Sequence, residues 1–150
     1  ITDDPSIDTE ATWSPDGQTL YFTSDRGGAP QVYAVAPRAG QRARRVTFGT
    51  NYAARPRVSP DGKQLAFVTQ EGGGLRVAVM DLASSQIATL SRGSQDESPS
   101  FAPNGAALIY AGRERGLGVL ATVSVDGQVS QQLKSDRGEV REPVWGPFAN

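Results

Sequence analysis

Short apolar runs alternate with polar turns along the whole chain, and the pattern repeats. Residues 20–22 read LYF, and the corresponding run in the next repeat, residues 65–67, reads LAF. Successive residues of a strand point to opposite faces of a sheet, so a strand that is apolar at consecutive positions is covered on both faces. We find no convincing apolar periodicity of helical type. The pattern therefore predicts an all-β protein in which sheets pack against other sheets.

The repeat has a fixed length. Trp13, Val58, Phe101 and Trp145 each precede a related turn sequence, and they follow one another at spacings of 45, 43 and 44 residues. Periods of about 40–45 residues that contain several strands are typical of propeller blades. We predict three four-stranded blades, about 11–48, 56–90 and 99–133, followed by one further inner strand over 143–148. The two tryptophans share a repeat position, which predicts packing between blades rather than stacking on a ligand.

The turn sequence itself is S-P-D-G or a close variant. In Pro15-Asp16-Gly17 the proline restricts φ, the aspartate tolerates a turn, and the glycine accepts a positive φ at little cost. The third copy replaces Asp with Asn104. A turn former explains all copies, so we predict tight hairpins between first and second strands and no catalytic role for these residues.

Composition excludes several function classes. The 15 basic residues nearly balance the 16 acidic ones, and the arginines near residue 42 lack interleaved aromatics, so we predict no nucleic-acid binding. The chain has no Cys and no His, which removes thiolate metal sites and His-containing catalytic triads. No apolar run approaches the ~20 residues of a membrane span, and we predict no membrane insertion. The glycine-rich turns do not continue into helices, as phosphate-binding loops do.

The position before each inner strand varies between repeats while the frame around it stays the same. These equivalent residues are Glu10, Arg55, Ser98 and Glu142, and the residues before them are Thr9, Ala54, Glu97 and Arg141. In a propeller the loops that contain them gather on one face around the channel mouth, opposite the S-P-D-G turns. Such variation is expected of a recognition surface, and also of an unconstrained surface.

Several segments resemble the carboxy-terminal propeller of the TolB family of the Tol–Pal system. They are "FTSDRGGAPQVY", "VMDLASSQIATL", "DESPSFAPNG" and "REPVWGPF", and the resemblance covers the chain in order. It implies a six-bladed β-propeller of which this chain supplies half, with 143–148 as the strand that closes the ring. We expect either a piece of a longer chain or a homodimer in which two copies complete six blades.

The same resemblance implies a function. It implies a periplasmic, non-enzymatic scaffold whose propeller face binds the lipoprotein Pal, and colicins at the same face, in support of outer-membrane integrity and cell division. Contact with TolA belongs to an amino-terminal region that this sequence lacks. The loop "DTEATW" matches the Pal-facing loop of the family, and the other repeats supply corresponding loops. The predicted partner-binding residues are Thr9, Glu10, Tyr52, Arg55, Asp96, Glu97, Arg141 and Glu142.

We predict no cofactor and no metal site, although the resemblance admits a calcium ion in the channel. The sequence contains no D-x-[DN]-x-[DN]-G loop, so solvated carboxylates are the expected state. Three other interpretations stay open. Asp96–Glu97 or Glu139–Glu142 are the candidate acid–base pairs of an enzyme. The chain also fits a regulatory propeller of a peptidase, or a natural or engineered half-propeller without a native ligand.

Overall fold

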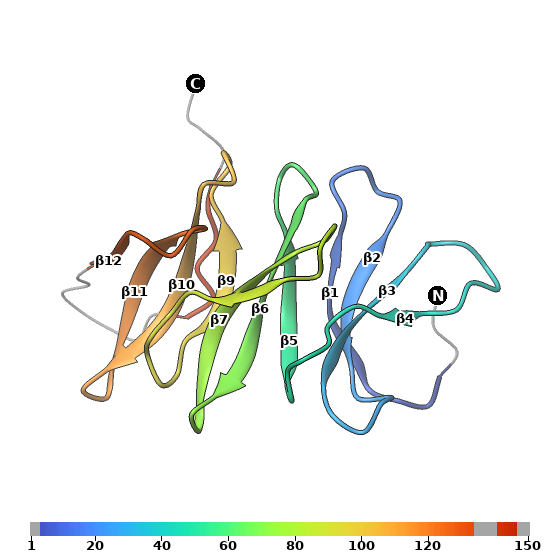
Figure 1. Cartoon of the computed structure of the whole chain (residues 1–150), viewed down its shortest axis with the longest axis horizontal. Helices are drawn as coiled ribbons and strands as arrows, with labels where there is room; N and C mark the ends of the chain where they lie inside the picture. Colours follow the sequence, from blue (N-terminus) through green and yellow to red (C-terminus); the bar gives the residue numbers. More distant parts are fainter. Residues whose placement is uncertain (1–3, 134–140, 147–150) are drawn as a thin grey trace.

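The computed structural model describes residues 4–133 and 141–146. Within them lie three four-stranded antiparallel sheets that follow one another along the chain (Figure 1). Blade 1 consists of β1 (Asp8–Trp13), β2 (Leu20–Ser24), β3 (Gln31–Val35) and β4 (Arg44–Arg45). Blade 2 consists of β5 (Ala53–Val58), β6 (Gln64–Glu71), β7 (Gly74–Asp81) and β8 (Ile87–Thr89). Blade 3 consists of β9 (Glu97–Phe101), β10 (Ala107–Glu114), β11 (Leu117–Ser124) and β12 (Ser130–Leu133).

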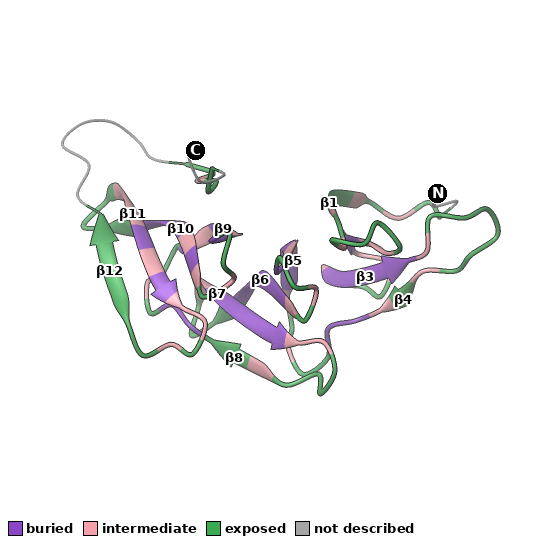
Figure 2. Cartoon of the chain, turned by 90° about the horizontal axis from the view of Figure 1, so that it is seen from above, coloured by how far each residue is buried: buried purple, intermediate pink, exposed green. Residues whose placement is uncertain are grey.

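The three sheets form an arc. Seen from above, β4, β8 and β12 lie on its outer side, and β1, β5 and β9 lie on its inner side (Figure 2). The turns between first and second strands lie at one edge of the arc, and those between second and third strands lie at the other (Figure 1). This arrangement confirms the predicted all-β partial propeller. In the part of the chain that is described, no helix is long and apolar enough to cross a membrane.

The S-P-D-G turns are held by their own side chains. Ser14 Oγ donates to Asp16 Oδ1 at 2.6 Å, the same carboxylate accepts the backbone N–H of Gln18 at 3.0 Å, and Gly17 has φ 68°. The second turn repeats these contacts, with Ser59 Oγ 2.6 Å from Asp61 Oδ1. A further copy, S-V-D-G at residues 124–127, joins β11 to β12 and was not predicted.

Two apolar clusters hold the blades together. The cluster between blades 1 and 2 includes Val32, Phe67 and Met80, and that between blades 2 and 3 includes Val77 and Leu108. Phe67 is fully buried. As predicted, the second strands are covered on both faces, because their alternate residues enter different clusters. Tyr21 of β2 meets blade 2, whereas its neighbour Phe22 belongs to a separate cluster on the opposite face of blade 1.

The first outer strand is shorter than the predicted strand over 44–48. After Arg45 the Val46 N–H still donates to the Val32 carbonyl at 2.8 Å, but the Val32 N–H donates to the Thr47 hydroxyl at 3.0 Å instead of to a backbone carbonyl. Blade 2 repeats this exchange, with the Val77 N–H 2.8 Å from Ser91 Oγ. A buried hydroxyl at the end of each of these outer strands therefore accepts a hydrogen bond from a backbone N–H of the third strand. This device explains why β4 stops early.

Two further expectations differ from the structure. Residues 143–146 form no strand, since no described strand pairs with them, and 147–148 lie outside the described residues. Trp13 and Trp145 are 51% and 39% exposed instead of packed between blades. The equivalent residues Val58 and Phe101 enter the cluster with the preceding blade. Trp13 has no preceding described blade to pack against.

Candidate binding face

A β-bulge interrupts the inner strand of every blade at the same place. In blade 1 the pairing with β2 skips from Thr9 to Thr12, and blades 2 and 3 show the same shift. The bulge lets pairing resume on its far side, so the inner strands begin two or three residues before the predicted blade starts. The bulged residue occupies the left-handed region of backbone space. Its φ is 56° in Glu10, 57° in Arg55 and 55° in Ser98. Glu142, the equivalent residue of the fourth repeat, has a φ of 49° although no described strand pairs with it.

These φ values are costly for residues other than glycine, by about 1–2 kcal/mol each. Strain of this kind persists where the surrounding structure imposes it, and it clusters at functional sites. The three bulged residues and Glu142 line one pocket of about 470 Å³ on the inner side of the arc. We call the four residues Glu10, Arg55, Ser98 and Glu142 the bulge ring. The structure thus brings together side chains that are some 45 residues apart in sequence.

Arg55 connects the three blades within this ring. Its Nε donates to Glu10 Oε1 at 3.0 Å, and its Nη1 donates to the carboxylate of Glu97 and to Ser98 Oγ, the latter at 3.3 Å. Its backbone N–H donates to Glu10 Oε2 at 3.1 Å and to Thr23 Oγ1 at 3.0 Å. Burial lowers the pKa of Arg55, but hydrogen bonds and charges from Glu97 and Glu10 outweigh that effect and raise the pKa overall. The guanidinium is therefore a fixed positive charge.

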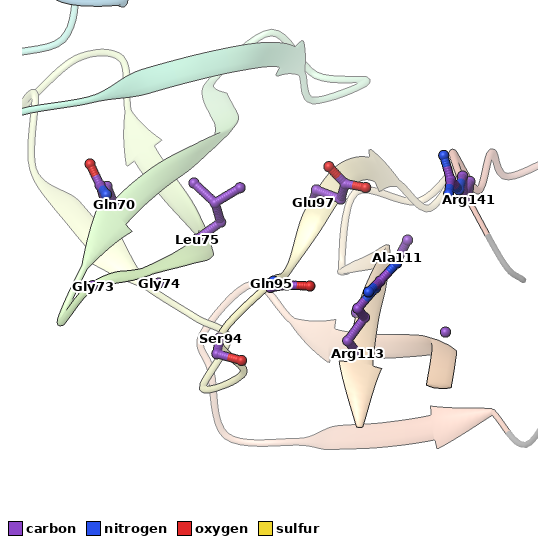
Figure 3. Close-up of a pocket in the computed structure, with 12 residues that line it drawn as sticks. Gln70, Gly73, Gly74, Leu75, Ser94, Gln95, Glu97, Ala111, Arg113 and Arg141 are labelled. Carbon is purple, nitrogen blue, oxygen red and sulfur yellow. The ribbon is translucent and has the colours of Figure 1, made fainter. Parts of the chain in front are cut away.

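A second pocket, of about 490 Å³, lies between blades 2 and 3. Gly73, Gly74 and Leu75 line it from blade 2, and Glu97 and Arg113 line it from blade 3 (Figure 3). Arg141, from the fourth repeat, also reaches its wall. Glu97 belongs to this pocket while its carboxylate is bound by Arg55, so the two pockets are neighbours on one continuous surface.

The structure places the eight predicted residues unequally. Glu10, Arg55 and Glu142 line the first pocket, and Glu97 and Arg141 line the second. Thr9 is exposed beside Glu10. Tyr52 is half-buried, and burial, followed by the charge of Glu10, raises its pKa.

Asp96 differs from the other seven. It is only 3% exposed, and its Oδ2 accepts the backbone N–H of Gly93 at 2.7 Å. Its own N–H donates to the Leu75 carbonyl at 3.0 Å. Asp96 therefore has almost no surface for a partner, and it holds the loop before β9 in place. Because Asp96 is buried, its carboxylate cannot act together with Glu97 as an acid–base pair on a substrate at the surface.

Two residues of the binding face, Thr23 and Arg113, were not among the predicted residues. Thr23 supports Glu10 from β2, with its Oγ1 3.2 Å from Glu10 Oε2, and Arg113 enters the second pocket from β10. Both lie on second strands, whereas only the loops before the inner strands were compared between repeats. At the position of Arg113 the earlier repeats carry Asp25 and Gln70. Extending the comparison to the second strands reveals this variation in charge.

The donor set does not fit a calcium ion at the ring. Among the described residues, no three acidic side chains come together in an arrangement that holds a metal. Calcium takes six to eight oxygen ligands, whereas Glu10 and Glu97 both bind the Arg55 guanidinium. A cation at this position would face a fixed positive charge.

Comparison with known proteins agrees with this architecture. Residues 1–149 match the family described as "TolB beta propeller domain". The chain is 54% identical, over 73% of its length, to the Tol-Pal system protein TolB of Xanthomonas campestris pv. campestris, and it spans 26% of that relative. It is similar in structure to TolB from Acinetobacter baumannii, with a TM-score of 0.90 and 44% identity over 99% of this chain and 37% of that one. A putative TolB from Agrobacterium tumefaciens, 20% identical, shares the fold with a TM-score of 0.83 over 94% of this chain and 50% of the other.

Proposed function

Because the chain belongs to the TolB β-propeller family, we propose that it is a non-enzymatic protein-binding scaffold of the Tol–Pal system and that the face containing the bulge ring binds Pal. TolB-like propellers are scaffold proteins rather than enzymes. The chain spans about a quarter of the length of the curated relatives that it matches. We place its action in the periplasm, in support of outer-membrane integrity and cell division.

The bulge ring is the observation that supports this proposal most strongly. Four non-glycine residues accept an unfavourable backbone conformation, and all four line one pocket. Glycine would relieve the strain at each position. Keeping charged or polar side chains there is consistent with side chains that contact a partner.

The chemistry of the ring suits a protein partner. Arg55 supplies a planar fork of donors, and the half-buried Tyr52 supplies a rigid amphipathic ring close by. Glu10 and Glu142 offer carboxylates that orient an approaching partner and affect its association rate. We expect colicin segments to compete for the same face, and TolA to contact a part of the longer relatives outside the quarter that matches this chain. The proposed face works without a cofactor.

Isothermal titration of the chain with the soluble domain of Pal tests the proposal. We expect saturable binding, with one Pal per two chains if two copies complete a six-bladed ring and one per chain if the half-ring binds alone. A triple variant, Thr9→Ala, Glu10→Gln and Tyr52→Ala, should weaken binding at least 10-fold. Lys63→Gln, in an S-P-D-G turn on the opposite face, is the control. Equal affinity of the wild type and the triple variant would assign Pal to another face.

A further inference from the structure

The pocket between blades 2 and 3 contains Arg113, whose guanidinium has no partner among the described residues. Arg113 is exposed at the end of β10, and no ion pair or hydrogen bond joins it to any described residue. Glu97 is the acidic residue of the same pocket, but its carboxylate is already bound by Arg55. The pocket therefore presents the charge of Arg113 without an opposite charge assigned to it.

The base of this pocket is rigid. The segment that leads into β9 pairs with the start of β7, with the Leu75 N–H 3.0 Å from the Ser94 carbonyl and the Asp96 N–H 3.0 Å from the Leu75 carbonyl. A Cβ added to Gly74 would lie 2.7 Å from the Ser94 carbonyl oxygen. A Cβ added to Gly112 would lie 2.8 Å from Asp96 Oδ1. Gly74 therefore allows β7 to lie directly against the Ser94 backbone, whereas a side chain at position 112 would displace the Asp96 carboxylate. The backbone hydrogen bonds between Leu75, Ser94 and Asp96 form the floor of the pocket.

The walls differ in chemistry. In Figure 3, Leu75 and Gln70 lie on the blade 2 side of the pocket, and Arg113 and Arg141 lie on the blade 3 side. Arginine matches the planar carboxylate group through two parallel hydrogen bonds. The apolar side chain of Leu75 suits the methylene groups of a short acidic side chain.

We propose that this pocket binds a carboxylate of the protein partner, with Arg113 as its anchor. The identity of the partner rests on the proposed function, whereas the carboxylate specificity rests on the pocket itself. The carboxylate comes either from an Asp or Glu side chain or from a chain terminus. In both cases Arg113 donates to it and Leu75 contacts the adjacent carbons.

Peptide titrations followed by NMR test the pocket without any natural partner. The probe is Ac-Gly-Glu-Glu-Gly-NH2, and Ac-Gly-Gln-Gln-Gly-NH2 is the uncharged comparison. We expect shifts at Arg113, Gly112 and Leu75 with the glutamate peptide only, and weaker binding as salt rises. Ac-Gly-Gln-Gln-Gly with a free carboxyl end separates the two sources, because it binds only if a chain terminus suffices.

Arg113→Gln should reduce the affinity for the glutamate peptide at least 10-fold, because glutamine carries no charge and cannot donate the two parallel hydrogen bonds of a guanidinium. Arg115→Gln removes the same charge from the same hairpin but does not line the pocket, so it should keep wild-type affinity. Equal losses in both variants would show that general charge, not the pocket, attracts the peptide. Equal binding of the glutamate and glutamine peptides would also overturn the proposal.

Titration of the same variants with the soluble Pal domain separates this inference from the proposed function. If the wild type and Arg113→Gln bind Pal equally well, the pocket is not part of the interface while the scaffold function stands. If no variant binds Pal but Arg113→Gln loses the glutamate peptide, the carboxylate site stands and the partner assignment fails. Loss of Pal affinity in Arg113→Gln alone, with Arg115→Gln unchanged, supports both.

Discussion

At the scale of single residues, Arg55 links all three blades through one side chain. It contacts Glu10 of blade 1 and Glu97 of blade 3 while it belongs to blade 2. The guanidinium is about one-third exposed, so solvent screens part of each ion pair. Removing it would nevertheless leave two carboxylates close together without a counter-charge.

We predict that Arg55→Met lowers the free energy of unfolding by about 1–2 kcal/mol, the contribution of a few half-exposed charged hydrogen bonds. Denaturant unfolding followed by circular dichroism measures this change. Arg92→Met, which removes an exposed arginine outside any described ion pair, is the control. A loss no larger than that of Arg92→Met would contradict the proposed role of Arg55 as a link between blades.

Tyr110 provides a second prediction at this scale. Burial, with a smaller contribution from the charge of Asp96, raises the pKa of its hydroxyl from 10.0 to about 12. Because the folded pKa is the higher one, the resulting stability is present below pH 10 and is lost as pH rises through the folded value. Tyr110→Phe should therefore be less sensitive than the wild type to pH in this window. Thermal unfolding across the alkaline range provides the measurement, and parallel curves for both proteins would argue against this linkage.

At the scale of elements, the S-x-D-G turns form a repeated device with one electrostatic signature. The serine hydroxyl, followed by a backbone N–H, lowers the pKa of Asp16, Asp61 and Asp126 below the ordinary value of 3.8. A lowered folded pKa contributes stability above pH 3.8 that disappears as pH falls through the folded value. These turns therefore make folding sensitive to acid.

We predict that replacing all three aspartates with asparagine flattens the loss of stability as pH falls below 3.8, because their folded pKa values lie below that ordinary value. Asparagine keeps the acceptor, as Asn104 shows by accepting the Ala106 N–H at 3.0 Å. Melting temperatures over this range measure the effect. If the triple variant loses stability with the wild-type pH dependence, the acid sensitivity arises elsewhere.

The elements also show how far sequence reasoning extends. The equal spacing of the repeats predicted that Glu10, Arg55, Ser98 and Glu142 are equivalent, because equal repeats occupy equal places in successive blades. The left-handed backbone at these residues was not predictable, since none of them is a residue type that favours it. Asp96 was predicted to contact a partner because it lies in a loop before an inner strand, and the repeat pattern does not indicate that its side chain is buried. Its burial depends on pairing with Leu75, a contact between residues that are distant in sequence.

At the scale of the whole molecule, each blade packs mainly on its neighbours, as in other repeat proteins. Phe67 lies fully buried in the cluster between blades 1 and 2, whereas blades 2 and 3 share a different cluster. Stability is then a sum of blade and interface contributions. A defect at one interface should not spread evenly through the arc.

We predict that Phe67→Ala costs about 3–5 kcal/mol and loosens blade 1 more than blade 3. Native-state hydrogen exchange resolves this difference, because amides of β2 and β3 should lose protection before those of β10 and β11. Phe48→Ala is the control, since Phe48 is 61% exposed and its ring lies against the Arg45 guanidinium outside both apolar clusters. Uniform loss of protection across all three blades would instead indicate a single cooperative unit.

The bulge has a consequence for how such a protein changes over time. Glutamate, arginine and serine occupy the same backbone conformation in successive repeats, so the path of the chain there does not depend on the side chain it carries. The side chain at this position of each repeat can therefore be exchanged, by evolution or by protein engineering, without a change in the backbone of the propeller. A new binding specificity can then arise by single substitutions, because the scaffold already holds a non-glycine residue at positive φ in these positions.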